Sequence, residues 1–101
     1  ELAHKYGAVT VVDAVHYAAH KPIDVKAIDT DILLCSAYKY FGPHVGVMYI
    51  RKELGESFPS VRVYAEDNAD MPTKMETGTL SVANIGRRVY CRPGREVRRV
   101  L

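Results

Sequence analysis

The feature that most constrains the fold is a short apolar run that ends, within a few residues, at a lysine and a Gly-Pro step. Ile32-Leu33-Leu34 leads through Cys35-Ser36-Ala37-Tyr38 to Lys39 and then to Gly42-Pro43. An apolar run bounded by turn residues is typical of a buried strand. A lysine at the end of such a strand is costly to bury as a cation, so its neutral amine becomes available as a nucleophile. Taken alone, this segment fits a surface lysine after a strand better than a reactive one.

A second stretch upstream has the same form and ends in a carboxylate. Residues 8–12 are continuously apolar or β-branched, and Asp13-Ala14-Val15-His16 follows them. Such runs predict strands of a parallel sheet. About eighteen residues join this strand to the one at residues 32–36, which is enough for a parallel crossover. Because ligands of open α/β sheets bind beyond the carboxyl ends of the strands, we expect Asp13 and Lys39 to act at one site.

A third strand is predicted at residues 45–50. About eight residues separate it from the strand that ends at Ser36, too few for a helical crossover, so it should run antiparallel. We also expect a helix end at residues 1–6 closed by Gly7, a short helix over residues 23–28 and a long irregular loop over residues 55–76. The fold class is therefore α/β.

Farther along, residues 77–81 predict a loop that leads into a helix, with Thr79 or Ser81 as its N-cap. Tyr40 and Phe41 are expected to pack. His4 and Arg51 belong to no motif and are expected at the surface.

Charge divides the chain at residue 87. Residues 1–86 hold eight Lys and Arg against eleven Asp and Glu, whereas residues 87–101 hold six Arg against one Glu. We therefore treat residues 1–86 as one unit and residues 87–101 as a basic tail of doubtful reading frame. The tail alone would also suit a small basic nucleic-acid-binding module, but it lacks interleaved aromatic residues and a recognisable motif. The first residue is Glu1, and we expect an internal fragment of a longer protein.

The cysteine content and the hydropathy bear on location. Two cysteines, Cys35 and Cys91, predict no disulfide framework and suit a reducing compartment, so we expect a cytoplasmic protein. No apolar stretch approaches the length of a membrane span, and no signal peptide is recognisable. His16 and His20 have the spacing of a metal-binding pair on a helix, but no third ligand stands at a suitable distance, so we expect no metal.

Together, the segments Asp13-Ala14-Val15-His16 and Ser36-Ala37-Tyr38-Lys39-Tyr40-Phe41-Gly42-Pro43 resemble the class V aminotransferase and cysteine desulfurase family. The resemblance covers roughly residues 1–85 and is nearest to the cysteine desulfurase-like branch. It implies part of the mostly parallel sheet in the large domain of a fold-type I enzyme that depends on pyridoxal 5′-phosphate (PLP).

The resemblance also implies a role for each matched residue. Lys39 would bind the cofactor aldehyde and then move protons. Asp13 would face the pyridine nitrogen, and His16 the phenolic oxygen. The cofactor phosphate would be bound by Ser36 and Tyr38, and by Thr79 acting across a homodimer interface.

The substrate implied by the resemblance is an amino acid, with cysteine favoured and converted to alanine with sulfur transfer. A class V aminotransferase or a kynureninase-like lyase stays open, because Tyr38 stands where many desulfurases carry histidine.

Overall fold

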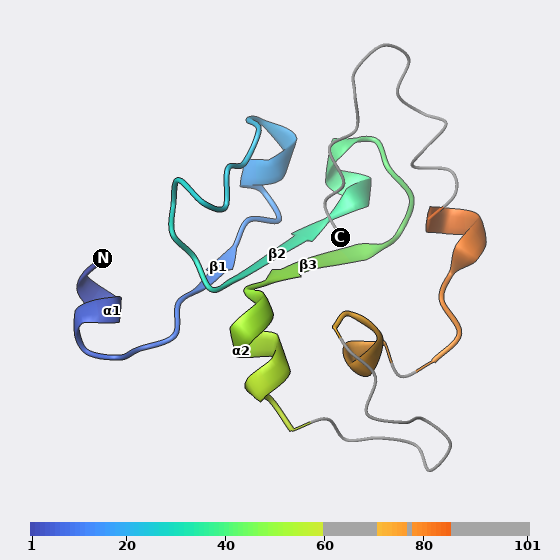
Figure 1. Ribbon diagram of the computed structural model, residues 1–101. Coiled ribbons are helices and arrows are strands. Elements are labelled where there is room, and N and C mark those ends of the chain that lie inside the picture. Colours follow the sequence, from blue (N-terminus) through green and yellow to red (C-terminus); the bar gives the residue numbers. More distant parts are fainter. Residues whose placement is uncertain (60–70, 77, 86–101) are drawn as a thin grey trace.

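Three strands form the centre of the protein, seen here in a computed structural model that describes residues 1–59, 71–76 and 78–85 (Figure 1). They are β1 (Val11–Asp13), β2 (Ile32–Ser36) and β3 (Gly46–Ile50), in the spatial order β1-β2-β3. β1 runs parallel to β2, and β3 runs antiparallel to it. The predicted strand directions are confirmed, and the product is a small α/β unit with a mixed sheet.

Short helices flank the strands. They are α1 (Leu2–Lys5), the 3₁₀ turns η1 (Tyr17–Ala19) and η2 (Ala37–Tyr40), α2 (Lys52–Ser57) and η3 (Thr73–Met75). The expected helix end at the N-terminus is confirmed, and Gly7 has the positive φ of 69° that such a cap requires. Farther along, residues 82–85 begin a helix directly after Ser81, whose carbonyl accepts hydrogen bonds from the backbone N–H groups of Asn84 and Ile85.

Three local expectations are wrong or only partly right. Residues 23–28 form no helix: the Asp24 carboxylate accepts hydrogen bonds from the backbone N–H groups of Lys26 and Ala27 and holds a turn instead. The first strand begins at Val11 and includes Asp13, rather than spanning residues 8–12. The expected loop over residues 55–76 includes the end of α2 and the whole of η3, and its residues 60–70 lie outside the described part of the chain.

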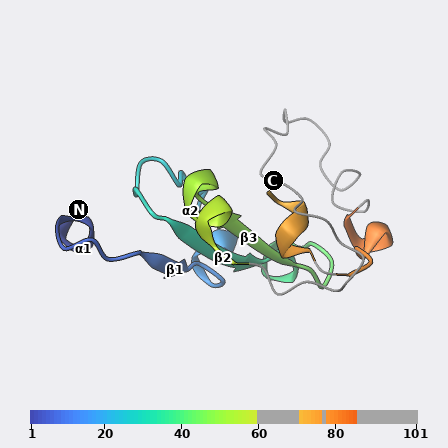
Figure 2. The same cartoon turned by 60° about the horizontal axis from the view of Figure 1, so that its bottom comes forward.

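Each face of the sheet follows from the strand register. Val12 pairs with Leu33, whereas Val11 shares the other face with Leu34 and Met48. Leu33 is buried, but Val11, Leu34 and Met48 are each more than a third exposed. Figure 2 shows α2 on one side of the strands and α1 beyond the start of β1. One apolar face of the sheet is thus largely uncovered by the described residues.

A cluster of charged side chains joins the segments that precede β1 and β2. His4 Nε2 lies 2.8 Å from Asp31 Oδ2, and His4 Nδ1 lies 3.1 Å from Asp29 Oδ2. Arg51 pairs with the same two carboxylates, at 2.9 Å from Asp29 and 3.1 Å from Asp31. Thr10 donates to Asp31 from its N–H and from its hydroxyl, both at 2.8 Å. His4 and Arg51 are partly exposed, so the expectation that they lie at the surface holds only in part: both side chains pair with these carboxylates.

This cluster shifts the titration of its carboxylates. Hydrogen bonds from the Thr10 backbone, from His4 and from the Thr10 hydroxyl hold the pKa of Asp31 well below its ordinary value of 3.8. The Arg51 guanidinium, with help from His4, lowers the pKa of Asp29. An imidazole donates hydrogen bonds to two carboxylates at once only when both of its ring nitrogens carry protons. The cluster joins α1, the turn before β2 and the end of β3.

The division of the chain at residue 87, with its basic tail, falls on residues 86–101, which lie outside the described part of the structure. In the described ranges, no helix is long and apolar enough to cross a membrane.

Candidate active site at the carboxyl ends of β1 and β2

Asp13 ends β1, at the edge of the sheet where the parallel strands finish. Its Oδ1 accepts a hydrogen bond of 3.0 Å from the backbone N–H of Val15. This bond fixes the direction of the carboxylate, because it closes a turn of two residues. The next residue, Ala14, is buried, and its N–H donates to the Leu34 carbonyl of β2 at 2.8 Å. Asp13 is therefore exposed but held in place by the strand beside it.

Ser36 ends β2 and leads into η2, the turn that carries Lys39. The Ser36 side chain makes no capping hydrogen bond to η2. Ala37, the first residue of η2, is completely buried, whereas Lys39 is half-buried. The buried Ala37 anchors η2 and thereby fixes the backbone of Lys39 relative to the end of β2.

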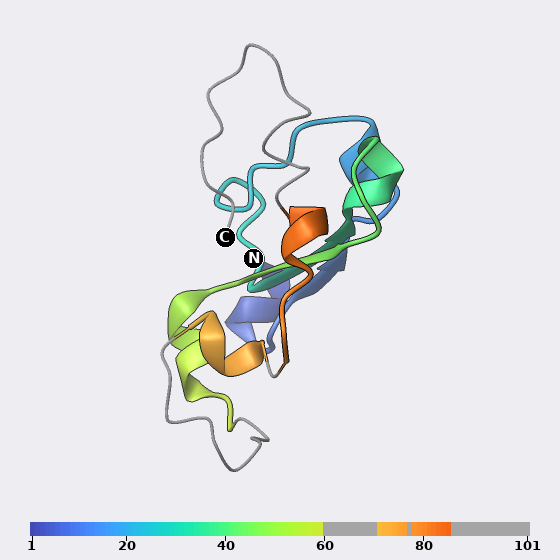
Figure 3. The same ribbon diagram turned by 90° about the vertical axis from the view of Figure 1, so that its right-hand side faces the viewer.

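The two turns that follow the strands lie side by side. η1 follows Asp13 and His16, η2 follows Ser36, and the two contact each other. Figure 3 shows them together at one end of the sheet, opposite α2. The structure therefore brings Asp13, His16, Ser36 and the lysine turn to a single edge, as the sequence predicts.

The turn from η2 to β3 is held closely against Ala37. The Gly42 N–H donates to the Ala37 carbonyl at 2.8 Å, and the Ala37 N–H donates to the Val45 carbonyl at 2.9 Å. A Cβ on Gly42 would lie 2.7 Å from the Ala37 oxygen. Gly42 is needed here because no side chain fits between the two backbones.

Tyr38 and His44 form an aromatic stack beside the lysine. Their ring centroids lie 5.0 Å apart, with 16° between the ring planes. The Lys39 Nζ lies over the Tyr38 ring, 5.2 Å from its centroid. The sequence indicated Tyr38 as a cofactor contact but not its stack with His44, which lies six residues farther along in a turn. No periodic pattern could have indicated a contact made by the folding back of an irregular loop.

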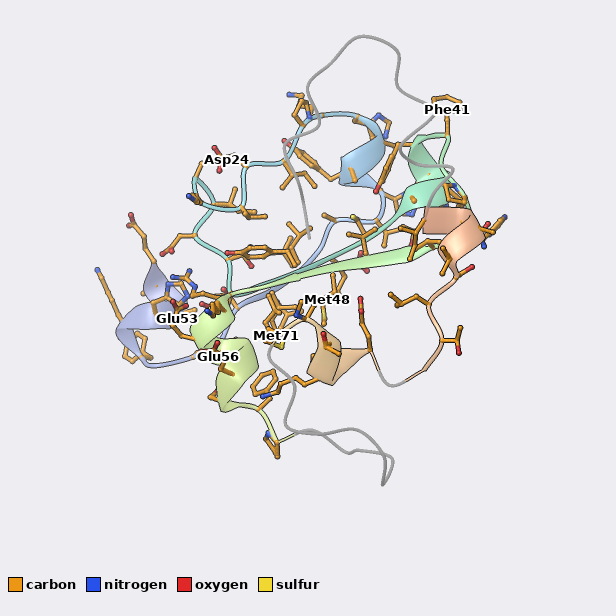
Figure 4. All side chains as sticks on the ribbon, turned by 45° about the vertical axis from the view of Figure 1, so that its right-hand side comes forward. Asp24, Phe41, Met48, Glu53, Glu56 and Met71 are labelled. Atoms are coloured by element: carbon orange, nitrogen blue, oxygen red, sulfur yellow. The ribbon has the colours of Figure 1, made fainter. Side chains whose placement is uncertain are left out.

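Phe41 departs from expectation. Its side chain is 99% exposed and it has a positive φ of 65°, so the prediction that Phe41 packs is wrong. Figure 4 shows the ring directed away from the ribbon. The tight turn to Gly42 determines the backbone of Phe41, and its side chain then points outward. Tyr40 is half-buried, and its hydroxyl lies 3.8 Å from the Cys35 thiol.

Thr79 is forty residues beyond Lys39 in the sequence. It is exposed, in the stretch over residues 78–85. Thr77, two residues before it, lies outside the described residues. The role of Thr79 in a neighbouring subunit stays a prediction.

A cavity of about 340 Å³ is lined in part by Asp13. Val12, Ala14, Tyr17 and the turn around Ile23 also line it, whereas Ser36 and Lys39 do not. The cavity therefore lies against Asp13 but not against Ser36 or Lys39. Among the described residues, no group of three or more His, Cys, Asp or Glu side chains is placed to hold a metal ion.

An amine and a carboxylate beyond the ends of neighbouring parallel strands stand where open α/β proteins bind their ligands. The family model "Aminotransferase class-V" matches residues 1–87. The chain belongs to this family, whose members depend on PLP.

Individual relatives agree with this assignment. A cysteine desulfurase of Escherichia coli (strain K12 / DH10B) is 37% identical over 59 residues, which are 57% of this chain and 14% of the relative. A nonribosomal peptide synthetase-like enzyme, fsqF, of Aspergillus fumigatus is 55% identical over 53 residues, 52% of this chain and 4% of that protein.

Solved structures of cysteine desulfurases resemble the fold. The enzyme CsdA from Escherichia coli superposes with a TM-score of 0.71 at 33% identity, over 83% of this chain. The apo enzyme from Thermococcus onnurineus NA1 superposes with a TM-score of 0.73 at 32% identity, over 82% of this chain. The superposed region is 24% of each of those chains, so this chain corresponds to about a quarter of their length.

The residues at this edge suit PLP. A carboxylate, an amine, two hydroxyl groups and an imidazole stand at one end of the sheet, on Asp13, Lys39, Ser36, Tyr38 and His16. These groups match the ring nitrogen, the aldehyde, the phosphate and the phenolic oxygen of the cofactor. The Asp13 carboxylate is oriented by Val15 and is exposed, so it can receive a further donor.

Proposed function

We propose that this chain is the central part of the PLP-binding large domain of a fold-type I enzyme that acts on amino acids. The favoured reaction is that of a cysteine desulfurase: cysteine is converted to alanine and its sulfur passes to an acceptor. One observation carries the proposal. Asp13 ends β1, Lys39 lies in η2 just after the neighbouring parallel strand β2, and η1 and η2, the turns that follow the two strands, contact each other in a chain of the class-V family.

Within this proposal, PLP supplies an electron sink for the α-carbon of the substrate. Lys39 binds the cofactor aldehyde, and its amine later carries a proton to and from the substrate. The Asp13 carboxylate accepts a charge-assisted hydrogen bond from the ring N–H and keeps that nitrogen protonated. His16 donates toward the phenolic oxygen. The hydroxyl groups of Ser36 and Tyr38 donate to the phosphate.

The position of the lysine supports its proposed task. Lys39 is half-buried and follows a turn whose first residue is completely buried. A group held in this way loses less freedom when it reacts than a lysine on a mobile surface segment. By contrast, Lys52 is about three-quarters exposed and pairs with Glu56, one helical turn away.

Chemical trapping tests the cofactor assignment. A full-length protein that carries these residues is treated with PLP and then with borohydride, and its peptides are mapped. The pyridoxyl group is expected on Lys39. A label on Lys21, Lys26 or Lys52 with none on Lys39 would show that the assignment is wrong. Lys39→Ala should remove the label and the turnover but leave the free energy of unfolding nearly unchanged.

Product analysis tests the reaction class. With cysteine as substrate, a desulfurase releases alanine and transfers sulfur in equal amounts. An aminotransferase instead forms a keto acid and needs an amino-group acceptor. A kynureninase-like lyase would cleave a carbon–carbon bond in a different substrate. Alanine formed in step with sulfur supports the desulfurase reaction, and a keto acid without sulfur transfer contradicts it.

We also propose a homodimer in which Thr79 reaches the phosphate at the partner's site. Heterodimers of one Lys39→Ala subunit and one Thr79→Ala subunit test this arrangement. If Thr79 acts across the interface, one of the two sites contains only native residues and recovers native PLP affinity. If Thr79 acts within its own subunit, both sites carry a defect and no native site appears.

A further inference from the structure

We propose that His44 is a positioning residue for Lys39, acting through the Tyr38 ring. The role rests on the proposed function only in that this amine is the one assigned to the cofactor. His44 stacks on Tyr38 at 5.0 Å, and the Lys39 Nζ lies 5.2 Å from the centroid of the same ring. The three side chains form one contiguous set, in which the tyrosine ring is the shared element.

The backbone explains why the two rings meet. The chain reverses direction between η2 and β3, and both ends of this turn are hydrogen-bonded to Ala37, through Gly42 and Val45. Ala37 is completely buried, and these two hydrogen bonds tie the turn to it. The turn therefore places His44 beside Tyr38, although His44 lies six positions farther along the sequence.

The stack matters because the Tyr38 side chain is not held by burial. It is 45% exposed, and the imidazole of His44 supplies a flat surface that restricts its rotation. A fixed ring face attracts the ammonium form of Lys39 and gives the amine a defined resting place. Without the imidazole, the phenol ring is free to leave, and the lysine loses this contact.

The test measures the reactivity of Lys39 directly, without cofactor. A full-length protein that carries these residues is treated at neutral pH with trinitrobenzenesulfonate, which labels free amines, and the rate at each lysine is followed by mass spectrometry. In His44→Ala, labelling of Lys39 should rise by about two- to fivefold relative to Lys52, because the amine loses its contact with the Tyr38 ring and reaches the reagent more freely. Tyr38→Ala should give a rise of at least the same size.

Two variants separate stacking from other effects. His44→Phe keeps a flat ring and should restore the native labelling rate of Lys39. His20→Ala removes an exposed imidazole just after η1, at the same end of the molecule, and should have no effect. An unchanged rate in His44→Ala overturns the proposal, and so does a failure of phenylalanine to rescue. An equal rise at Lys52 would show general loosening and would overturn it as well.

Borohydride trapping with PLP on the same proteins separates this inference from the proposed function. If native protein carries no pyridoxyl group on Lys39, the cofactor assignment fails, whatever the labelling rates are. If Lys39 is trapped but its labelling rate does not depend on His44, the positioning role alone fails.

Discussion

Gly42→Ala should loosen the lysine turn more than any other single methyl group added in this region. The new Cβ would lie 2.7 Å from the Ala37 oxygen, 2.9 Å from the Ala37 Cβ and 3.0 Å from the Ala37 carbonyl carbon. All three atoms belong to a completely buried residue, so none can swing aside. Overpacking of this kind costs about 1–3 kcal/mol. In the variant, the hydrogen bond from the Gly42 N–H to the Ala37 carbonyl would also be weakened, which costs about 0.5–1.5 kcal/mol.

Gly46→Ala is the matched control. Gly46 lies four residues farther along, begins β3, and a Cβ there would meet nothing within 4 Å. Since alanine also has less freedom than glycine in the unfolded chain, this variant should be neutral or more stable by about 0.4–1 kcal/mol. The two substitutions add the same atom to the same type of residue and differ only in the space available.

Native-state hydrogen exchange in a full-length protein measures the difference locally. The Ala37 amide, which donates to the Val45 carbonyl, reports the opening of the turn. In Gly42→Ala, a loss of about 1.5–4.5 kcal/mol corresponds to exchange that is about 10- to 2000-fold faster at this amide. In Gly46→Ala, exchange should stay near the native rate. Equal exchange in the two variants would refute the argument that contact with Ala37 excludes a side chain at Gly42.

Asp13→Asn keeps the shape of the side chain but removes the charge that holds the cofactor nitrogen protonated. The steady-state turnover rate should therefore fall about a thousandfold or more. A near-normal rate would show that Asp13 is not the pyridine partner. The lowered pKa of Asp31 means that its ionised form stabilises the fold at neutral pH, and that this contribution is lost as the pH falls below the ordinary value of 3.8. The free energy of unfolding of Asp31→Asn, measured with urea, should therefore be lower than that of native protein at pH 7 and should fall less on acidification. An equal dependence of the free energy of unfolding on pH in the two proteins would contradict this. Expressed alone, the 101-residue chain should aggregate and bind PLP weakly, because Leu34 and Met48 lie on an uncovered sheet face. A monodisperse monomer in light scattering would disprove this prediction.

Local sequence determined the strands and the edge at which the chemical groups gather. A run such as Ile32-Leu33-Leu34 favours a strand wherever it is buried, and the lengths of the two connections decide whether the next strand runs parallel or antiparallel. For that reason the directions of β1, β2 and β3, and the common edge of Asp13 and Ser36, could be predicted. Residue identity and spacing also sufficed to indicate the family.

Tertiary structure decided the contacts that depend on loops and on long-range pairing. The charged cluster joins His4 to Asp31 across 27 positions and closes on Arg51, and no periodic pattern links those residues. The stack of Tyr38 and His44 likewise exists only because the turn folds back on Ala37. The outward Phe41 is the converse case, since hydrophobicity predicts burial, whereas the tight backbone turn imposes a conformation that leaves the ring in solvent. Sequence periodicity reports the average environment of a strand or helix, but a loop side chain takes its direction from backbone angles that only the folded chain fixes.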